Sequence, residues 1–295
     1  MRSKLAYIAS ENFAPYLFVL PVVIFLLLMT VFPLVYSLFL SFNEWNLAFG
    51  TPRHFVGGQN YLKLFNDPRF WNAMLNTGYK VLIGVGIQFL LGLGLAILFN
   101  RKFPGKGILL AIFILPSILA PVVAATTFRM IYNYSYGPLN FILDKLGIGT
   151  FNWLGSSALA LPSIIAVDSW QWTPFMMLVL LAGLQSIPVE YYEAARVDGA
   201  DRFQAFFRIT LPLLRRSIAI ALIIRIMDAV KLFDLVYVLT NGGPGNSSET
   251  IPFYTYLSGF KHFRMGYTAA MSYIQLIFLI IMAQLFLRIW KQGEA

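Results

Sequence analysis

The sequence has 295 residues, of which 58% are hydrophobic and 12% are charged, and its formal net charge is +9 at pH 7. Soluble domains usually carry about 25% charged residues, so this composition excludes an ordinary soluble enzyme and predicts an integral membrane protein. Cysteine is absent, which excludes disulfides, thiolate nucleophiles and cysteine-bound metals. The two histidines, His54 and His262, lie in predicted loops, so we expect no metal site. In such a chain the positive charge reports topology rather than nucleic-acid binding.

Six apolar stretches of roughly 20 residues or more predict an all-α integral membrane protein with six transmembrane helices. The first stretch follows basic residues, as a signal peptide would, but it is too long for one and no cleavage pattern follows it, so we expect a retained helix. In chain order, the predicted helices span 15–41, 70–99, 108–131, 158–184, 217–240 and 266–290.

Lysine and arginine are distributed unequally between the two sides of the predicted bundle. Twelve lie in the termini, at the C-terminal end of the sixth helix (Arg288) and in the connections after the second and fourth helices, whereas six lie in the other three connections, 42–69, 132–157 and 241–265. Because cytoplasmic loops carry the excess of basic residues, both termini, 1–14 and 291–295, are predicted to be cytoplasmic. An even number of spans agrees with this orientation.

The longest polar connection, 185–216, is predicted to be cytoplasmic and helical. Pro188 suits a helix start, and Gly199 allows the chain to turn before a second short helix that ends at Pro212. The second helix is expected to pack an apolar face under the bundle through Phe203, Phe206 and Phe207.

The residue pattern of this connection is specific. Glu193-Ala194-Ala195 is followed after three residues by Gly199, after nine more by Ile209, and then after one by Leu211-Pro212. This pattern resembles the signature loop of binding-protein-dependent ABC importer permeases at every position. The resemblance implies a type I ABC importer transmembrane fold over 70–290 and a coupling helix that sits in a cleft of an ATPase subunit. The coupling residues it implies are Tyr191, Glu193, Ala194, Ala195, Asp198 and Gly199.

Three further stretches are similar to carbohydrate permeases, and among these to the first, larger permease of maltose importers. They are 170–175 (WQWTPF) with 180–184 (LLAGL), 239–244 (LTNGGP) and 136–140 (YGPLN). The maltose permease has additional N-terminal spans and a large external domain that this sequence lacks, so contact with a binding protein is expected to use shorter loops.

The resemblance also implies a solute pathway formed by the third, fourth and fifth helices. Matching the family's motifs onto this sequence places the pathway at Ser117, Pro121, Asp168, Gln171, Trp172, Phe175, Asp228, Ala229, Lys231, Leu232 and Phe233. Carboxylates and amides suit solute hydroxyls, and aromatic faces suit the C–H face of a sugar ring.

Ionisable residues inside the membrane are costly and therefore invite a functional hypothesis. Arg225, Asp228, Lys231 and Asp234 lie three residues apart in the predicted fifth helix, and Asp168 lies in the fourth. Two interpretations remain open. One is a ladder of ion pairs within the helix, and the other is a polar wall along the pathway.

The resemblance therefore implies a permease subunit of an ATP-driven importer for a sugar or sugar-like solute, in a bacterial or archaeal plasma membrane. A polyol, an anionic sugar derivative or glycerol phosphate is the alternative cargo, and a secondary transporter or channel is the alternative from another class. The sequence has no phosphate-binding G-x-x-x-x-G-K-[ST] loop, so we expect no enzyme and no bound cofactor, with ATP and Mg used by a partner. The expected partners are a second homologous permease, two ATP-binding subunits, a periplasmic or lipid-anchored solute-binding protein and membrane lipid, without nucleic acid.

Overall fold

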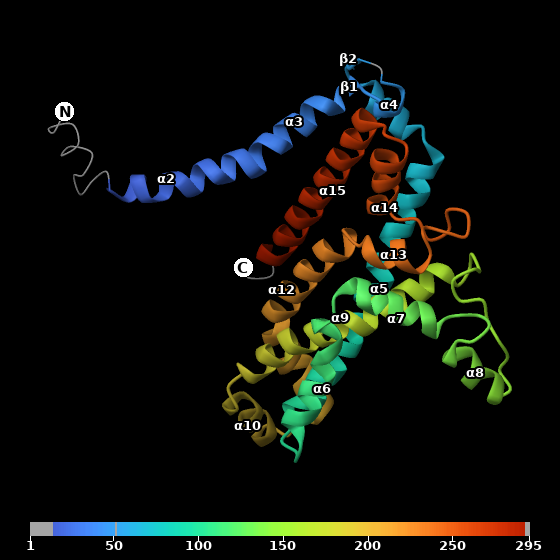
Figure 1. Ribbon diagram of the computed structural model, residues 1–295. Coiled ribbons are helices and arrows are strands. Elements are labelled where there is room, and N and C mark those ends of the chain that lie inside the picture. Colours follow the sequence, from blue (N-terminus) through green and yellow to red (C-terminus); the bar gives the residue numbers. More distant parts are fainter. Residues whose placement is uncertain (1–13, 51, 293–295) are drawn as a thin grey trace. The chain divides into compact units, whose positions relative to one another are not determined.

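A computed structural model describes residues 14–50 and 52–292, and its regular structure is almost entirely helical (Figure 1). The chain divides into two compact units: Met1–Asn66 with Thr255–Gln275, and Asp67–Tyr254 with Leu276–Ala295. Most of the predicted N-terminal stretch, 1–13, and the end of the predicted tail, 293–295, lie outside the described residues. The all-α class is as predicted.

The first unit begins with a long apolar helix that coincides with the first predicted span. α2 (Ala14–Leu26), a π-helical turn η1 (Leu27–Val31) and α3 (Phe32–Ser41) follow one another without a break. Large apolar side chains are exposed all round this stretch, and none of its most apolar 18-residue segment is buried. A helix that is apolar on every side suits contact with lipid.

A small polar cap follows α3 in the same unit. β1 (Asn43–Glu44) pairs antiparallel with β2 (His54–Phe55), with a 3₁₀ turn η2 (Leu47–Phe49) between them and α4 (Gln59–Phe65) after them. The amide of Asn60 donates to the carbonyls of Ser41 and Asn43, both at 2.9 Å, and this fixes α4 to the end of α3. The later segment of this unit, Thr255–Gln275, contains the end of α14 (Ile251–Tyr256), η4 (Leu257–Lys261) and the first part of α15 (Met265–Gln292).

The second unit is built around α9 (Ala160–Gln185), and 67% of the most apolar 18-residue segment of this helix is buried. It packs most extensively against α5 (Pro68–Asn100) and also contacts α6 (Lys106–Ile118), α7 (Pro121–Ile131), α12 (Leu211–Val230) and α13 (Asp234–Leu239) (Figure 1). α5 and α9 approach closely at Gly92, where an added Cβ atom would lie 2.8 Å from Cβ and Cγ of Met176. Glycine is therefore required there by packing.

The six predicted spans are not six uninterrupted helices. Among the described residues, four helices are long and apolar enough to cross a membrane, and α6 with α7 makes a fifth only if a pair bent by 95° counts as one span. The prediction of one continuous helix over 108–131 is wrong, because Pro116 and Pro121 flank a break after Ile118. The predicted fifth span, 217–240, is also interrupted: α12 ends at Val230 and α13 begins at Asp234.

The connection 185–216 differs from its prediction after the glycine turn. α10 (Glu190–Val197) and α11 (Arg202–Ala205) form as expected, but a π-helical turn η3 (Phe206–Thr210) then joins α11 directly to α12. Pro212 does not end the helix, because it lies in the first turn of α12. Phe203 and Phe207 are 78% and 60% exposed, so the predicted packing of this face under the bundle is wrong for both.

Candidate functional site

Charged and amide side chains from three helices of the second unit meet in its interior. We call Lys80 and Gln88 of α5, Asp168 of α9, and Arg225 and Asp228 of α12 the charge cluster. Asp168 is fully buried at its centre, with Oδ1 2.6 Å from Nη2 of Arg225 and Oδ2 3.1 Å from Nζ of Lys80. The amide of Gln88 donates to Oδ2 of the same carboxylate at 3.0 Å.

Arg225 connects the buried part of the charge cluster to its exposed part. Its side chain is 1% exposed, while that of Asp228 is 51% exposed. Besides the bond to Asp168, Nε donates to Oε1 of Gln88 at 2.7 Å and Nη1 donates to Oδ2 of Asp228 at 2.6 Å. The guanidinium carbon also lies 4.8 Å from the centre of the Trp172 ring, in a cation–π contact.

The charge cluster balances two cations against two carboxylates. Burying an unpaired charge costs several kcal/mol, which makes balanced pairing and complete hydrogen bonding necessary for stability. The predicted ladder within one helix is correct only for Arg225 and Asp228. Lys231 is exposed beyond the end of α12, and Asp234 begins the next helix. The pairing runs between helices instead.

Sequence reasoning missed Lys80 and Gln88 as members of this cluster. Lys80 is 1% exposed in the middle of α5, and its Nζ also donates to the carbonyl of Ala229 at 3.1 Å. The available signal was a lysine inside an otherwise apolar predicted span, since such a residue normally has a partner.

The predicted pathway residues lie in three environments. Asp168, Gln171 and Ala229 are buried, and Asp228 and Lys231 are exposed. The half-buried group is Ser117, Pro121, Trp172, Phe175, Leu232 and Phe233. The geometry brings Trp172 together with Asp228 through Arg225, and Phe175 packs edge-on against Trp172 at 6.2 Å between ring centres. Phe233 stacks instead on Tyr237 and Phe253.

Gln171 stabilises the break in the predicted third span. A break in a helix frees backbone carbonyls, which need partners inside a membrane. The amide of Gln171 donates to the carbonyl of Leu119 at 2.8 Å, at the break between α6 and α7. The hydroxyl of Ser117 donates to the carbonyl of Ile114 at 2.8 Å just before the break. Gln171 and Ser117, both predicted to line the pathway, therefore form hydrogen bonds to backbone carbonyls near the break.

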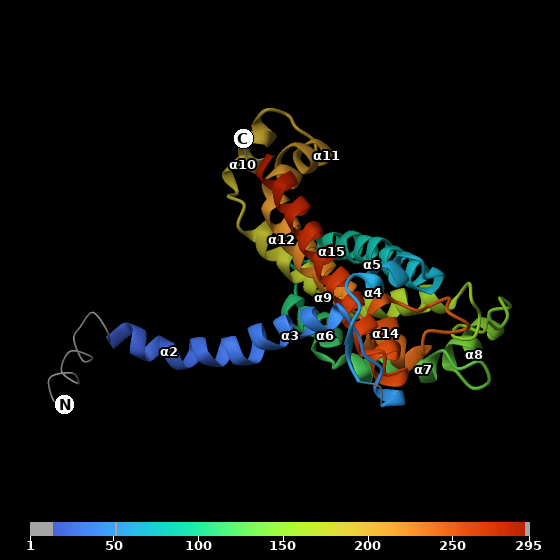
Figure 2. The same cartoon turned by 90° about the horizontal axis from the view of Figure 1, so that it is seen from above.

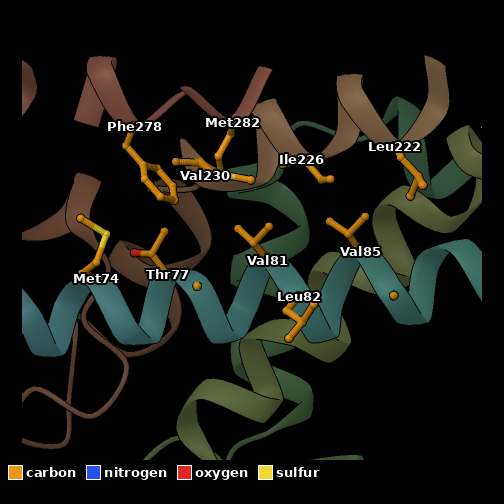
Figure 3. Close-up of a pocket in the computed structure, with 12 residues that line it drawn as sticks. Met74, Thr77, Val81, Leu82, Val85, Leu222, Ile226, Val230, Phe278 and Met282 are labelled. Carbon is orange, nitrogen blue, oxygen red and sulfur yellow. The ribbon is translucent and has the colours of Figure 1, made fainter. Parts of the chain in front are cut away.

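Two cavities of the second unit are apolar. One of about 350 Å³ lies between α5, α12 and α15, where Val81, Ile226 and Phe278 face one another (Figure 3). Another of about 650 Å³ lies between α5, α6 and α9 and is lined mainly by aliphatic and aromatic side chains. Such walls offer few partners to hydroxyl groups, so neither cavity suits a sugar. The exposed carboxylate and half-buried rings beside Arg225 suit one better.

The predicted coupling residues lie together at one end of the second unit, and α7 and α8 (Pro138–Lys145) lie at the other (Figures 1 and 2). Gly199 adopts a left-handed φ of +76° that favours glycine. The hydroxyls of Tyr192 and Thr210 lie 3.0 Å apart and tie α10 to η3. Ala195 is buried, and the exposed coupling residues are Tyr191, Glu193, Ala194, Asp198 and Gly199.

Comparison with protein families matches residues 88–291 to the family described as "Binding-protein-dependent transport system inner membrane component". Among similar proteins, the trehalose/maltose transport system permease protein MalF of Thermococcus litoralis is 38% identical over 90% of this chain and 88% of its own length. The sulfoquinovosyl glycerol transport system permease protein SmoG of Agrobacterium fabrum is 37% identical over 93% and 89%. The arabinooligosaccharides transport system permease protein AraP of Bacillus subtilis is 33% identical over 95% and 89%.

Among solved structures, a chain of a bacterial ABC transporter involved in the import of the acidic polysaccharide alginate has a TM-score of 0.84 at 24% identity, covering 98% of this chain and 99% of that one. At this identity the likeness concerns the fold alone. It agrees with the predicted type I importer fold.

Proposed function

Since this chain belongs to the family of binding-protein-dependent transport system inner membrane components, we propose that it is the permease subunit of an ATP-driven importer for a sugar or sugar-like solute. The relatives named for trehalose and maltose, sulfoquinovosyl glycerol and arabinooligosaccharides support this class of cargo. The chain contributes the membrane pathway, and a partner subunit binds and hydrolyses ATP with Mg.

The observation that carries this proposal is the exposed surface of α10 and the turn that follows it. Glu193 and Ala194 are exposed on α10, and Gly199 turns the chain directly after it. Val197 is 88% exposed and Tyr191 is 52% exposed, so apolar surface lies beside the acidic side chains of α10. The contact of Tyr192 with Thr210 fixes this acidic and apolar surface in place. Such a surface suits binding in a cleft of an ATP-binding subunit.

The remaining partners follow from the same assignment. A second, homologous permease would complete the pathway, with two ATP-binding subunits below and an external solute-binding protein above. The basic residues of 196–216 support placing α10 and both termini in the cytoplasm of a bacterial or archaeal cell. Asp228, Trp172 and Phe175 would then face the solute from within the membrane.

Two charge changes on the α10 surface test the coupling role. Glu193→Lys and Gly199→Asp should release the ATP-binding subunit from the purified importer and abolish ATP-dependent uptake, because one reverses a charge on this surface and the other disfavours the positive φ. Asp144→Lys is the matched control, since Asp144 is exposed on α8 at the opposite end of the unit. Uptake by this chain alone without ATP would refute the proposed function.

A further inference from the structure

Arg225 contacts both side chains that the proposed solute site would use most directly. Nη1 donates to the carboxylate of Asp228 at 2.6 Å, and the guanidinium carbon lies over the Trp172 ring, 4.8 Å from its centroid. Two other nitrogens of the same guanidinium also donate hydrogen bonds, Nε to Gln88 at 2.7 Å and Nη2 to Asp168 at 2.6 Å. One rigid group therefore determines where an exposed carboxylate and an aromatic face lie relative to each other.

This arrangement has the parts that recognition of a sugar ring requires. A carboxylate accepts hydrogen bonds from hydroxyls, and an aromatic ring covers the apolar C–H face of the sugar. Both groups gain from being held in place before the solute arrives, because less conformational freedom is then lost on binding. A planar guanidinium holds two such partners in a fixed relative orientation, whereas an ammonium group is a compact point charge without a preferred plane.

We propose that Arg225 is a positioning residue that presents Asp228 and Trp172 to a neutral, polyhydroxylated solute. The inference rests on the proposed function and adds to it the charge class of the cargo. Arg225 itself does not touch the solute, since its side chain is 1% exposed and its bonds are directed to other protein groups.

The charge balance at the site argues for a neutral cargo. The cations of the charge cluster, Lys80 and Arg225, are both 1% exposed and paired with carboxylates. The exposed member of the cluster is the carboxylate of Asp228, which would repel an anion. Lys231 is an exposed cation just beyond α12, and it is therefore the residue through which an anionic cargo would bind if this proposal were wrong.

The test uses the complete importer in proteoliposomes with its binding protein. The readout is the number of solute molecules transported per ATP hydrolysed, because a folding defect lowers transport and hydrolysis together and leaves this ratio unchanged. The probes are two neutral sugars, trehalose and maltotriose, and one acidic disaccharide of uronic acids. Arg225→Lys should lower the ratio for a neutral sugar about ten-fold, the size expected for a lost hydrogen bond to a charged group. Arg216→Lys, an exposed arginine on the same helix, should not change it.

A second variant separates positioning from general damage. Asp228→Asn alters an exposed side chain, and it should also lower the ratio about ten-fold. Because Arg225 acts through Asp228, the double variant should lose no more than about two-fold beyond the worse single variant. Losses that multiply to about a hundred-fold would overturn the positioning role.

The charge of the transported solute is tested separately from the role of Arg225. Uptake of a neutral sugar, without uptake of the acidic disaccharide, supports the proposal. Uptake confined to the acidic disaccharide, and abolished by Lys231→Gln, overturns the neutral class and leaves the importer function intact. ATP-independent uptake, or none of any probe, counts against the proposed function itself.

Discussion

Removing the central carboxylate of the charge cluster should destabilise the permease strongly. Asp168→Asn keeps the shape of the side chain but leaves Lys80 and Arg225, both 1% exposed, with a single carboxylate that is half exposed. The new amide nitrogen would also face one of three donors that lie 2.6 to 3.1 Å from the native oxygens. An uncompensated buried charge costs about 3–5 kcal/mol.

Lys80→Met should cost less than Asp168→Asn. It leaves Asp168 paired with Arg225 and places the excess negative charge on the exposed Asp228, so we expect about 1–2 kcal/mol. The double variant restores neutrality among the remaining groups. Its loss should therefore be smaller than the sum of the two single losses by at least about 1 kcal/mol.

The assay is thermal unfolding of the purified permease in lipid nanodiscs. At about 2–4 °C per kcal/mol, Asp168→Asn should lower the midpoint on the order of 10 °C. Asp144→Asn, an exposed substitution of the same chemistry on α8, should leave the midpoint within about 1 °C. Equal midpoints for these two variants, or strict additivity with Lys80→Met, would refute the assigned pairing.

Two packing predictions can be checked by the same measurement. Gly92→Ala should destabilise by about 1–3 kcal/mol, because its Cβ would lie 2.8 Å from Met176, whereas Gly94→Ala, with nothing within 4 Å, should be neutral or stabilising. Gln171→Leu should cost about 1–3 kcal/mol by leaving the carbonyl of Leu119 without its donor, and hydrogen exchange should rise around the break; unchanged exchange there would contradict the assigned role.

The apolar spans and the coupling segment were the most predictable parts of the chain. Both depend on local properties, namely the length of an apolar run and the residues that start and turn a helix. α10 begins at Glu190, two residues after Pro188, and Gly199 makes the turn after it. The roles assigned to the individual coupling residues stay predictions.

Partner choice between helices was not predictable from spacing. Asp168 and Arg225 were recognised as costly residues, but nothing in one sequence indicates that Lys80 and Gln88 face them from α5. The three-residue spacing suggested that Lys231 would extend a ladder, and the end of α12 at Val230 prevents this. Tertiary contacts decided both points.

The broken third span was only partly predictable. Pro116 and Pro121 are visible in the sequence and restrict the residues before them, so an interruption could have been inferred. The 95° bend and the bond from Gln171 to Leu119 could not. They require knowing that α9 passes beside the break.

The π-helical turn η3 makes α11 and α12 one continuous helix from Arg202 to Val230. At about 1.5 Å per residue, Arg225 lies roughly 35 Å along this helix from its start beside α10. If the helix moves as a lever, a tilt of about 5° at the α10 end displaces Arg225 by roughly 3 Å, about the length of one hydrogen bond. A small movement at the cytoplasmic surface would then be large enough to change which partners Arg225 holds, and with them the position of Asp228.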